Sequence, residues 1–512
     1  MKPLTSKEWP HRAAIGRWSA ILLMAAGMQT LALPPLHAAT TNKEITDRGI
    51  TSAVEKELRL EKGVLPDLVD VGTSQGIVTL SGSVDNLLAK ERAVKIAESL
   101  RGVLGVIDRI TVMPVSRADQ DIRKDILMAL LQDPATESYQ VAVSVQNAVA
   151  TLTGSVHSYV EAQLAIRIAK GVKGIKEIHD KITINFLAKN TDPEIAADVK
   201  ARLQWDIWIN GGLINVTVKD GQVTLTGAIG SAISKSRAFD DAWVYGVRSV
   251  DDSGLKVVPS VPHEARRTLE YAIKADSEVK QAVLAALHLD PRVMAFSPDV
   301  TVEDGAVILS GNVGNLKAKT AAEQDAHNII GVGRVDNLLK VKPKEWPSDA
   351  EMQKQLKAAL SWDPLLDGPA IDVAVLNRAA YLSGAVDSSL QKTEAHDAAS
   401  RIKGVVLVRN HLKVEPGFSI CYYDWPFYRL SPYYVSETSE PQAYQSDEQI
   451  KKNIENAFFW SPFVHSDDIT VSVDGGVATL TGTVGSWIAY GEADKDAHES
   501  GATVVRDHLN VK

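Results

Sequence analysis

One short pattern occurs six times in this 512-residue chain, and this repetition constrains the fold more than any other feature. The copies are GIVTLSGSV (76–84), AVATLTGSV (148–156), GQVTLTGAI (221–229), GAVILSGNV (305–313), RAAYLSGAV (378–386) and GVATLTGTV (476–484). Each alternates apolar with small or polar residues, which is typical of a half-buried strand. The spacing of about 70 to 100 residues predicts an array of six small domains.

The residues before each copy predict a helix and then a short strand. In the second copy, Gln120 to Pro134 places apolar residues at helical spacing, and Pro134 ends the helix. Pro291, Pro364 and Pro462 end the equivalent segments. Asp-Gly, Gly-Gly or Asn at the following turns, as in Asp220-Gly221, favours a two-residue antiparallel hairpin. The glycine inside the repeated strand predicts a bulge or the close approach of another backbone.

A second helix and a third strand complete each unit. The segment from Leu87 carries an apolar stripe, and glycines mark where such helices end, at Gly102, Gly171, Gly246, Gly331, Gly404 and Gly501. A third strand such as Val106 to Val112 should pair in parallel after the helix. The sequence therefore predicts an α+β fold, a tandem array of six α-β-β-α-β domains. Each should be a three-stranded mixed sheet covered by two helices.

This order, with V-x-L-x-G-x-V in the hairpin and G-V-x-x-V-x-N/D-x-L at the end, resembles the BON family of bacterial osmotically inducible and nodulation proteins. The resemblance covers about 430 residues, and the third copy departs from it through an insertion in VRSVDDSGLKV (247–257). The expected units are a signal peptide at 1–38, BON-like domains at 44–114, 118–186, 192–258, 276–343 and 348–415, an aromatic-rich insert at 416–445, and a sixth BON-like domain at 446–512.

The first 38 residues are typical of a secretory signal peptide. Four basic residues precede the apolar run Ser19 to Leu33, and Ala38 offers a small residue for cleavage before Ala39. Removing this segment lowers the formal net charge from −9 to −12, which disfavours general binding to nucleic acid or anionic membranes. Cys421 is the only cysteine, so no internal disulfide can form. We therefore expect a bacterial periplasmic protein, free or peripheral on the inner or outer membrane.

The insert at 416–445 holds nine of the 30 aromatic residues of the chain. One interpretation is a connector whose rings pack onto domain five or six. The other is an aromatic surface for a lipid interface or a protein partner, since Tyr and Trp favour positions that are half exposed to water. The candidate contact residues are Tyr422, Tyr423, Trp425, Phe427, Tyr428, Tyr433 and Tyr434.

Three tryptophans share one register near the end of the first helix of copies three, five and six: Trp205, Trp362 and Trp460. Packing in the domain core, against the hairpin, is one explanation. The BON resemblance implies another, because some BON domains are thought to meet phospholipid through their first helix. These tryptophans are therefore candidate lipid or partner contacts.

No recurring residue pattern indicates catalysis. His327, His396 and His498 lie in different registers of the second helices, which predicts solvated helix residues and no zinc site. An Asx or Ser residue does recur before the last apolar pair of the third strand: Asp108, Asp180, Ser253, Asp336, Asn410 and Asp507. Because Asn and Ser replace Asp in two copies, hydrogen bonding to local backbone explains this position better than acid-base chemistry. We expect no enzyme, no cofactor and no metal site.

The leading hypothesis is an exported, non-enzymatic array of BON domains that binds phospholipid or envelope protein clients in osmotic or envelope stress. The resemblance implies the lipid and stress part. Linking several weak modules raises their effective concentration, which gives a physical reason for six copies. The alternative is an accessory structural or assembly protein that docks a secretion or channel complex. Neither hypothesis includes nucleic acid or a small-molecule substrate.

Overall fold

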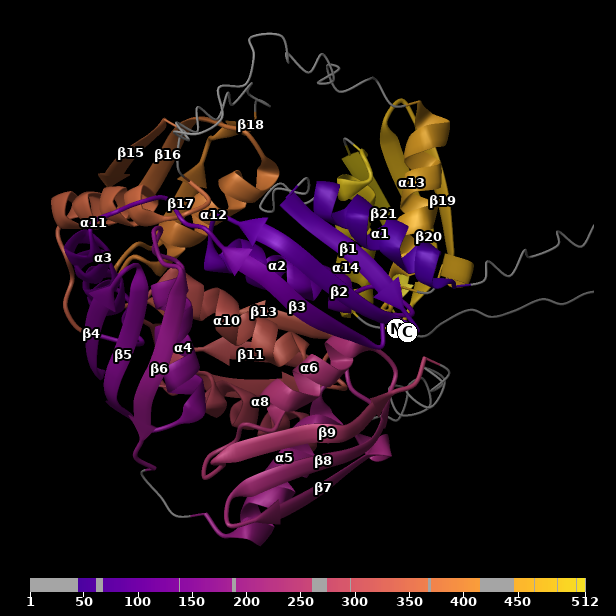
Figure 1. Ribbon diagram of the computed structural model, residues 1–512, viewed down its shortest axis with the longest axis horizontal. Helices are drawn as coiled ribbons and strands as arrows, with labels where there is room; N and C mark the ends of the chain where they lie inside the picture. The colour runs from indigo at the N-terminus through magenta and orange to yellow at the C-terminus, as the bar shows by residue number, and fades with distance from the viewer. Residues whose placement is uncertain are drawn as a thin grey trace, which may run out of the picture. The chain divides into compact units, whose positions relative to one another are not determined.

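Each copy of the pattern folds into two helices and a three-stranded sheet in the computed structural model, as the sequence predicts (Figure 1). The structure describes residues 45–60, 68–137, 139–186, 190–259, 274–294, 296–366, 370–414, 446–464, 466–485, 487–502 and 504–511. Ile45 to Lys512 belong to one compact unit. The predicted signal peptide, the segment 260–273 and the insert 416–445 lie outside the described residues.

The first three repeats share one order of elements. Repeat 1 contains α1 (Asp47–Leu60), β1 (Val69–Ser74), β2 (Ile77–Val84), α2 (Leu87–Glu98) and β3 (Gly105–Val112). Repeat 2 contains α3 (Asp119–Gln132), β4 (Gln140–Gln146), β5 (Val149–Val156), α4 (Tyr159–Lys170) and β6 (Glu177–Ile184). Repeat 3 contains α5 (Asp192–Trp205), β7 (Ile214–Lys219), β8 (Gln222–Ile229), α6 (Ala232–Asp241) and β9 (Ser249–Val257).

The last three repeats keep this order, with broken strands in repeats 4 and 5. Repeat 4 contains α8 (Asp276–Leu289), α9 (Pro291–Met294), β10 (Asp299–Glu303), β11 (Ala306–Ser310), β12 (Asn312–Val313), α10 (Leu316–His327), β13 (Arg334–Asn337) and β14 (Lys340–Val341). Repeat 5 contains α11 (Asp349–Trp362), β15 (Ile371–Leu376), β16 (Ala379–Val386), α12 (Ser389–Arg401), β17 (Leu407–Asn410) and β18 (Lys413–Val414). Repeat 6 contains α13 (Asp447–Trp460), β19 (Ile469–Asp474), β20 (Val477–Val484), α14 (Trp487–Glu499) and β21 (Val504–Val511).

The repeated strand is the middle strand of the main sheet in each repeat; in repeat 4 its end, β12, pairs with β14 alone. In repeat 1, β2 pairs antiparallel with β1 and parallel with β3, so the sheet is mixed as predicted. Val78 and Leu80 of β2 point to the helix side, where both are fully buried in one core with Ala93 of α2. The α+β prediction is therefore confirmed, and the alternation in the repeated pattern is the alternation between core and solvent.

The strand glycine allows the two hairpin strands to approach closely. A Cβ atom at Gly82 would lie 2.1 Å from the carbonyl oxygen of Leu68, and one at Gly154 would lie 1.9 Å from that of Gln140. Both glycines also have positive φ, at 109° and 125°. The predicted close approach of another backbone is thus confirmed.

The hairpin turn of each repeat is held by the first residue of its first helix. The Asp119 carboxylate accepts the N–H groups of Asn147 and Ala148, at 2.8 and 3.0 Å. Both turn residues have positive φ, 51° and 61°. The same bidentate arrangement recurs at Asp47, Asp192, Asp276, Asp349 and Asp447. One carboxylate in each repeat therefore joins the first helix to the hairpin.

One of the glycine predictions at the end of the second helix is wrong. Gly171 has φ −73° and is the C-cap of α4, whereas Gly174 has φ +94°. Gly174 corresponds to Gly102, because both precede the third strand by the same distance. The predicted left-handed conformation is confirmed at Gly102, Gly246, Gly331, Gly404 and Gly501.

The Asx residue of the third strand bonds backbone, as predicted, but two of the six assigned positions are wrong. Asp108, Asp180, Asn410 and Asp507 each accept the N–H group two residues later, at 2.9 to 3.2 Å. In repeat 4 this residue is Asn337 and not Asp336, and in repeat 3 it is Asp251, which accepts the N–H of Ser253. Repeat 3 differs because its predicted insertion shifts the register between β8 and β9.

Candidate functional site

The tryptophan at the end of the first helix lies between repeats. The carbonyl oxygen of Trp205 accepts the N–H of Ile330 in repeat 4 at 2.9 Å. The carbonyl oxygens of Trp362 and Trp460 accept the N–H groups of Lys173 in repeat 2 and Arg101 in repeat 1, at 2.7 and 2.8 Å. Each donor immediately precedes the positive-φ glycine of its repeat. Repeat 3 therefore contacts repeat 4, repeat 5 contacts repeat 2, and repeat 6 contacts repeat 1, in one common way.

The indole side chains enter the core of the contacted repeat. Trp362 is 7% exposed and packs with the core of repeat 2, and Trp460 is 7% exposed and packs with the core of repeat 1. Trp205 is partly buried against the core of repeat 4. The sequence predicted packing against the domain's own hairpin or contact with a lipid or partner. The packing takes place across two repeats, and the lipid role of these tryptophans stays a prediction.

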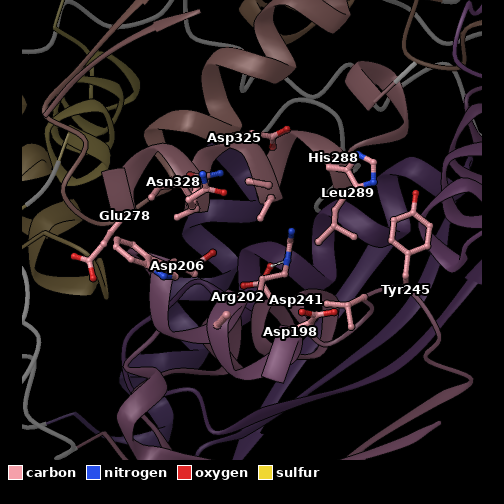
Figure 2. A pocket seen from close by; sticks show the side chains of 18 of the residues that line it. Asp198, Arg202, Asp206, Asp241, Tyr245, Glu278, His288, Leu289, Asp325 and Asn328 are labelled. Atoms are coloured by element: carbon pink, nitrogen blue, oxygen red, sulfur yellow. Dashed lines mark hydrogen bonds and ion pairs between the residues drawn. The ribbon is translucent and has the colours of Figure 1, made fainter. Parts of the chain in front are cut away.

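The contact between repeats 3 and 4 forms a half-open cavity of about 820 Å³. Figure 2 shows its lining, which comes from α5, α6 and the residues after α6 in repeat 3 and from α8 and α10 in repeat 4. The walls combine small apolar side chains with buried charges. We refer to this space as the 3–4 cavity.

Two carboxylates of repeat 3 lie at this cavity. The Asp206 carboxylate accepts the N–H of Trp208 and the Nε–H of Arg237, each at 2.6 Å. Asp241 accepts the Nε–H of Arg202 through Oδ1 at 2.8 Å. Its other oxygen, Oδ2, is shielded from solvent and receives no N–H group within the part of the chain that the structure describes, while the Asp241 and Asp206 carboxyl groups share a side-chain hydrogen bond. The two carboxyl groups are therefore paired with the arginines and with each other.

The environment changes the protonation of these acids. Burial, together with the charge of Asp206 and the hydrogen bond to it, raises the pKa of Asp241 to about 7 against the opposing charges of Arg202 and Arg237. In repeat 4, burial and the charge of Asp290 raise the pKa of Asp325. The pKa of Asp290 is lowered instead, because its hydrogen bonds and ion pair with Arg292 outweigh its burial. Asp241 and Asp325 therefore keep a proton to a higher pH than Asp290 does.

Comparison with known proteins assigns the repeats to a family. The model of the BON domain matches residues 46–114, 118–185, 191–259, 275–343, 348–416 and 446–512. The chain belongs to the BON domain family.

Two curated proteins show similarity to part of this BON array. Osmotically-inducible protein Y of Escherichia coli is 31% identical over 143 residues, which are 27% of this chain and 71% of that protein. Outer membrane lipoprotein DolP of Haemophilus influenzae is 30% identical over 141 residues, which are 27% of this chain and 66% of that protein. Both matches extend over about two BON repeats.

A solved structure of CdsD, a structural protein of the Type III secretion system of Chlamydia trachomatis, also aligns with the array. It shares 15% identity and covers 44% of this chain and 98% of its own, with a TM-score of 0.12. At that TM-score the similarity carries no argument.

Sequence reasoning missed the acidic residue that ends the first helix of several BON repeats. Asp133, Asp206, Asp290 and Asp363 are C-cap residues, and each accepts the N–H two residues later, at 2.6 to 2.9 Å. The signal in the sequence is the Asp-Pro pair that ends three of these helices, at Asp133-Pro134, Asp290-Pro291 and Asp363-Pro364. Burial, followed by the charge of Glu394, also raises the pKa of Asp363 to about 7.

The histidine prediction is correct for two residues and wrong for the third. His396 and His498 are exposed, whereas His327 is half-buried with Nδ1 shielded from solvent. Burial lowers the pKa of His327 against the charge of Glu323. Within the described ranges, no group of three or more His, Cys, Asp or Glu residues is placed to hold a metal ion, and no helix is long and apolar enough to cross a membrane. The candidate aromatic residues from Tyr422 to Tyr434 lie outside those ranges.

Proposed function

We propose that this protein is an exported, non-enzymatic BON array that binds surfaces of the bacterial envelope, either phospholipid or envelope proteins. The family assignment of all six repeats carries the proposal. The names of the two relatives, an osmotically inducible protein and an outer membrane lipoprotein, support a role at the envelope and in osmotic stress. The periplasm is the proposed location, on the basis of the signal-like residues 1–38.

An exposed apolar surface on repeat 5 supports this proposal. Leu376, Ala379 and Leu407 are cross-strand neighbours in β15, β16 and β17, and Tyr381 lies on the same face. Leu376 is 61% exposed, Leu407 40% and Tyr381 38%. The opposite face of the sheet carries the core residues. Ala379 between them is 8% exposed, so the exposed apolar side chains are those of Leu376, Leu407 and Tyr381. Such a group is a common feature of binding surfaces.

The aromatic insert supplies the second proposed contact. Its seven candidate residues, Tyr422 to Tyr434, include the ring types that favour membrane interfaces and protein interfaces. Trp205, Trp362 and Trp460 remain candidates for the same role only where their repeats separate, because two of them are 7% exposed in the assembled chain. We therefore place the main contact on the insert and on repeat 5.

Vesicle co-sedimentation tests the proposal. The mature chain from Ala39 onward should sediment with zwitterionic vesicles, and anionic lipid should not strengthen binding because the formal net charge is −12. Deletion of residues 416–445 should abolish sedimentation, and Leu376→Ser with Leu407→Ser should weaken it severalfold. Leu338→Ser, which alters an apolar residue 60% exposed on repeat 4, is the matched control.

The outcomes separate the two kinds of partner. Sedimentation that depends on the insert supports a lipid surface. Capture of outer-membrane proteins without vesicle binding supports protein clients. A mature chain that binds neither vesicles nor envelope proteins contradicts the proposed function.

A further inference from the structure

We propose that the contact between repeats 3 and 4 is held closed by two shared protons, one in each repeat, and opens as pH rises. Each proton is shared by two neighbouring carboxyl groups. This conformational switch goes beyond the proposed function, and it does not depend on which envelope partner the array binds.

The two carboxyl pairs occupy equivalent positions in their repeats. In repeat 3, Asp206 is the C-cap of α5 and Asp241 is the tenth residue of α6. In repeat 4, Asp290 is the C-cap of α8 and Asp325 is the tenth residue of α10. The members of each pair share a side-chain hydrogen bond. Each of the other four repeats has an acid at no more than one of these two positions.

The segment around Asp206 makes the backbone contact with repeat 4. The carbonyl oxygen of Trp205 accepts the N–H of Ile330 at 2.9 Å, and the N–H of Ile207 donates to the carbonyl oxygen of Asn328 at 3.0 Å. Asp206 lies between these two residues and forms an antiparallel bridge with repeat 4. A displacement of Asp206 therefore acts directly on the bonds that join the repeats.

The pair of repeat 4 is connected to the same contact. Asp325 lies on α10 three residues before Asn328, and it lines the 3–4 cavity, as the pair of repeat 3 does (Figure 2). Leu289, which directly precedes Asp290, packs against the core of repeat 3. Repulsion within either pair should therefore widen the same interface.

The positive charge at the contact matches the pairs only while they hold protons. Arg202 and Arg237 donate to the pair of repeat 3, and Arg292 donates to Asp290. The charge of Arg202 also acts on Asp325 across the contact. With one proton in each pair, three positive charges face two negative ones, and without the protons they face four. Like charges repel strongly in surroundings of low dielectric.

Both pairs are shielded from water. Asp206 and Asp241 are each 5% exposed, and Asp290 is 9% exposed. Asp325 is half-buried, but its Oδ2 is shielded from solvent, as is Oδ2 of Asp241. A charged oxygen in such surroundings is unfavourable, whereas an O–H group on one carboxyl can donate to the other. The closed contact therefore favours a shared proton in each pair.

The protonation of the pairs sets the direction of the switch. Burial and the neighbouring carboxylate raise the pKa of Asp241 to about 7, and the same two causes raise the pKa of Asp325. When the contact opens, water reaches both groups and their pKa returns toward the ordinary value of about 3.9. The closed contact therefore holds protons that the open contact releases to solvent. By linkage, this stabilisation is complete below about pH 4 and is lost as pH rises to about 7.

Other ionisable groups surround the two pairs. Those that line the cavity with the pairs are Asp198 of α5, Tyr245 after α6, and Glu278 and His288 of α8. Asp133 and Tyr139 of repeat 2 lie near Asp290. Histidine ionises in the same pH range as the proposed switch, so His288 requires its own control.

Amide hydrogen exchange in the full chain tests the proposal. The amide of Ile330 reports the contact between repeats 3 and 4, and that of Arg101 reports the contact between repeats 1 and 6, which contains no such pair. The ratio of the two rates cancels the pH dependence that all amide exchange shares. We expect the rate of Ile330 relative to Arg101 to rise at least tenfold between pH 5 and pH 8, since each released proton changes the opening equilibrium by up to about tenfold per pH unit.

Asp241→Asn combined with Asp325→Asn should keep this ratio low and constant, because an amide can donate to the neighbouring carboxylate and carries no charge. Asp220→Asn combined with Asp299→Asn is the matched control, since these two acids are exposed in the same two repeats. The control should keep the tenfold rise. His288→Gln should keep it as well, because His288 is exposed on α8.

Asp206→Asn covers the case in which the double variant fails to fold. It removes the charge that opposes ionisation of Asp241 and leaves Asp241 able to titrate, so the rise should move to lower pH. A ratio that stays constant or falls with pH in the wild-type chain would overturn the proposal. A rise that persists in the double Asn variant, or that His288→Gln abolishes, would also overturn it.

Discussion

At the residue scale, the carboxylate at the first position of each first helix explains why the hairpin turns tolerate different sequences. Turns of two residues with positive φ favour Asn-Gly or Asp-Gly, yet Asn377-Arg378 and Asn147-Ala148 adopt the same conformation. Asp349 and Asp119 accept both turn N–H groups in these repeats. The charge-assisted bonds offset the strain that a residue with a Cβ atom has at positive φ.

We expect Asp119→Ala to lower the free energy that opens the hairpin of repeat 2 by about 1 to 3 kcal/mol, because two hydrogen bonds to a charged group are lost. Amide hydrogen exchange at Asn147 and Ala148 should accelerate accordingly. Asp121→Ala is the matched control, since Asp121 lies exposed in the same first turn and contacts neither amide. Equal exchange in the two variants would show that the carboxylate does not hold the turn.

The element scale shows what the sequence could and could not predict. Periodicity, proline and glycine marked the two helices, the hairpin and the third strand, because these signals act within a few residues. Gly171 was mistaken for Gly174 because both glycines follow the same helix, and only the backbone conformation separates them. The pairing of Asp241 with Asp206 and Arg202 had no signal in the sequence, since these residues come together only where α5 and α6 pack.

Helix α6 should make the contact between repeats 3 and 4 sensitive to pH. The pKa of Asp241 is raised to about 7 in the folded protein, above its usual value of about 3.9 in an unfolded chain. The folded state therefore holds a proton that the unfolded state has lost between these values. By linkage, this group contributes stability at low pH that is lost as pH rises from about 4 to 7.

Asp241→Asn should remove this dependence without removing that of Asp363, whose pKa is also about 7. The stability of the variant relative to wild type should increase between pH 5 and pH 8, measured by urea denaturation. If the difference in the free energy of unfolding between variant and wild type stays constant over this range, the pKa of Asp241 is not raised in the folded protein.

At the scale of the whole molecule, the repeats meet through residues in equivalent registers. The tryptophan contacts join repeats 3 and 4, 2 and 5, and 1 and 6. A second set joins the first three repeats, because the first residue of each second helix packs on the core of another repeat. Leu87 of repeat 1 contacts repeat 2, Tyr159 of repeat 2 contacts repeat 3, and Ala232 of repeat 3 contacts repeat 1.

This arrangement gives the tandem array a physical rationale. Covalent linkage raises the effective concentration of each partner repeat. The recurrence of Trp205, Trp362 and Trp460 was visible in the sequence, whereas their partners were not, since Trp460 and Arg101 are separated by most of the chain. Our central claim is that six BON repeats form one assembly through these three tryptophan contacts together with those of Leu87, Tyr159 and Ala232.

Hydrogen exchange at single-residue resolution in the full chain tests that claim most directly. The amides of Arg101, Lys173 and Ile330 should exchange slowly, and those of Tyr245 and Lys403, at the equivalent position of repeats 3 and 5, should exchange faster. Trp362→Ala should destabilise the contact between repeats 5 and 2 by about 3 to 5 kcal/mol. The amide of Lys173 should therefore exchange faster, whereas the exchange rate of Arg101 should not change. Fast exchange at all five amides, with no response of Lys173 to the variant, would show that the repeats do not pair in this way.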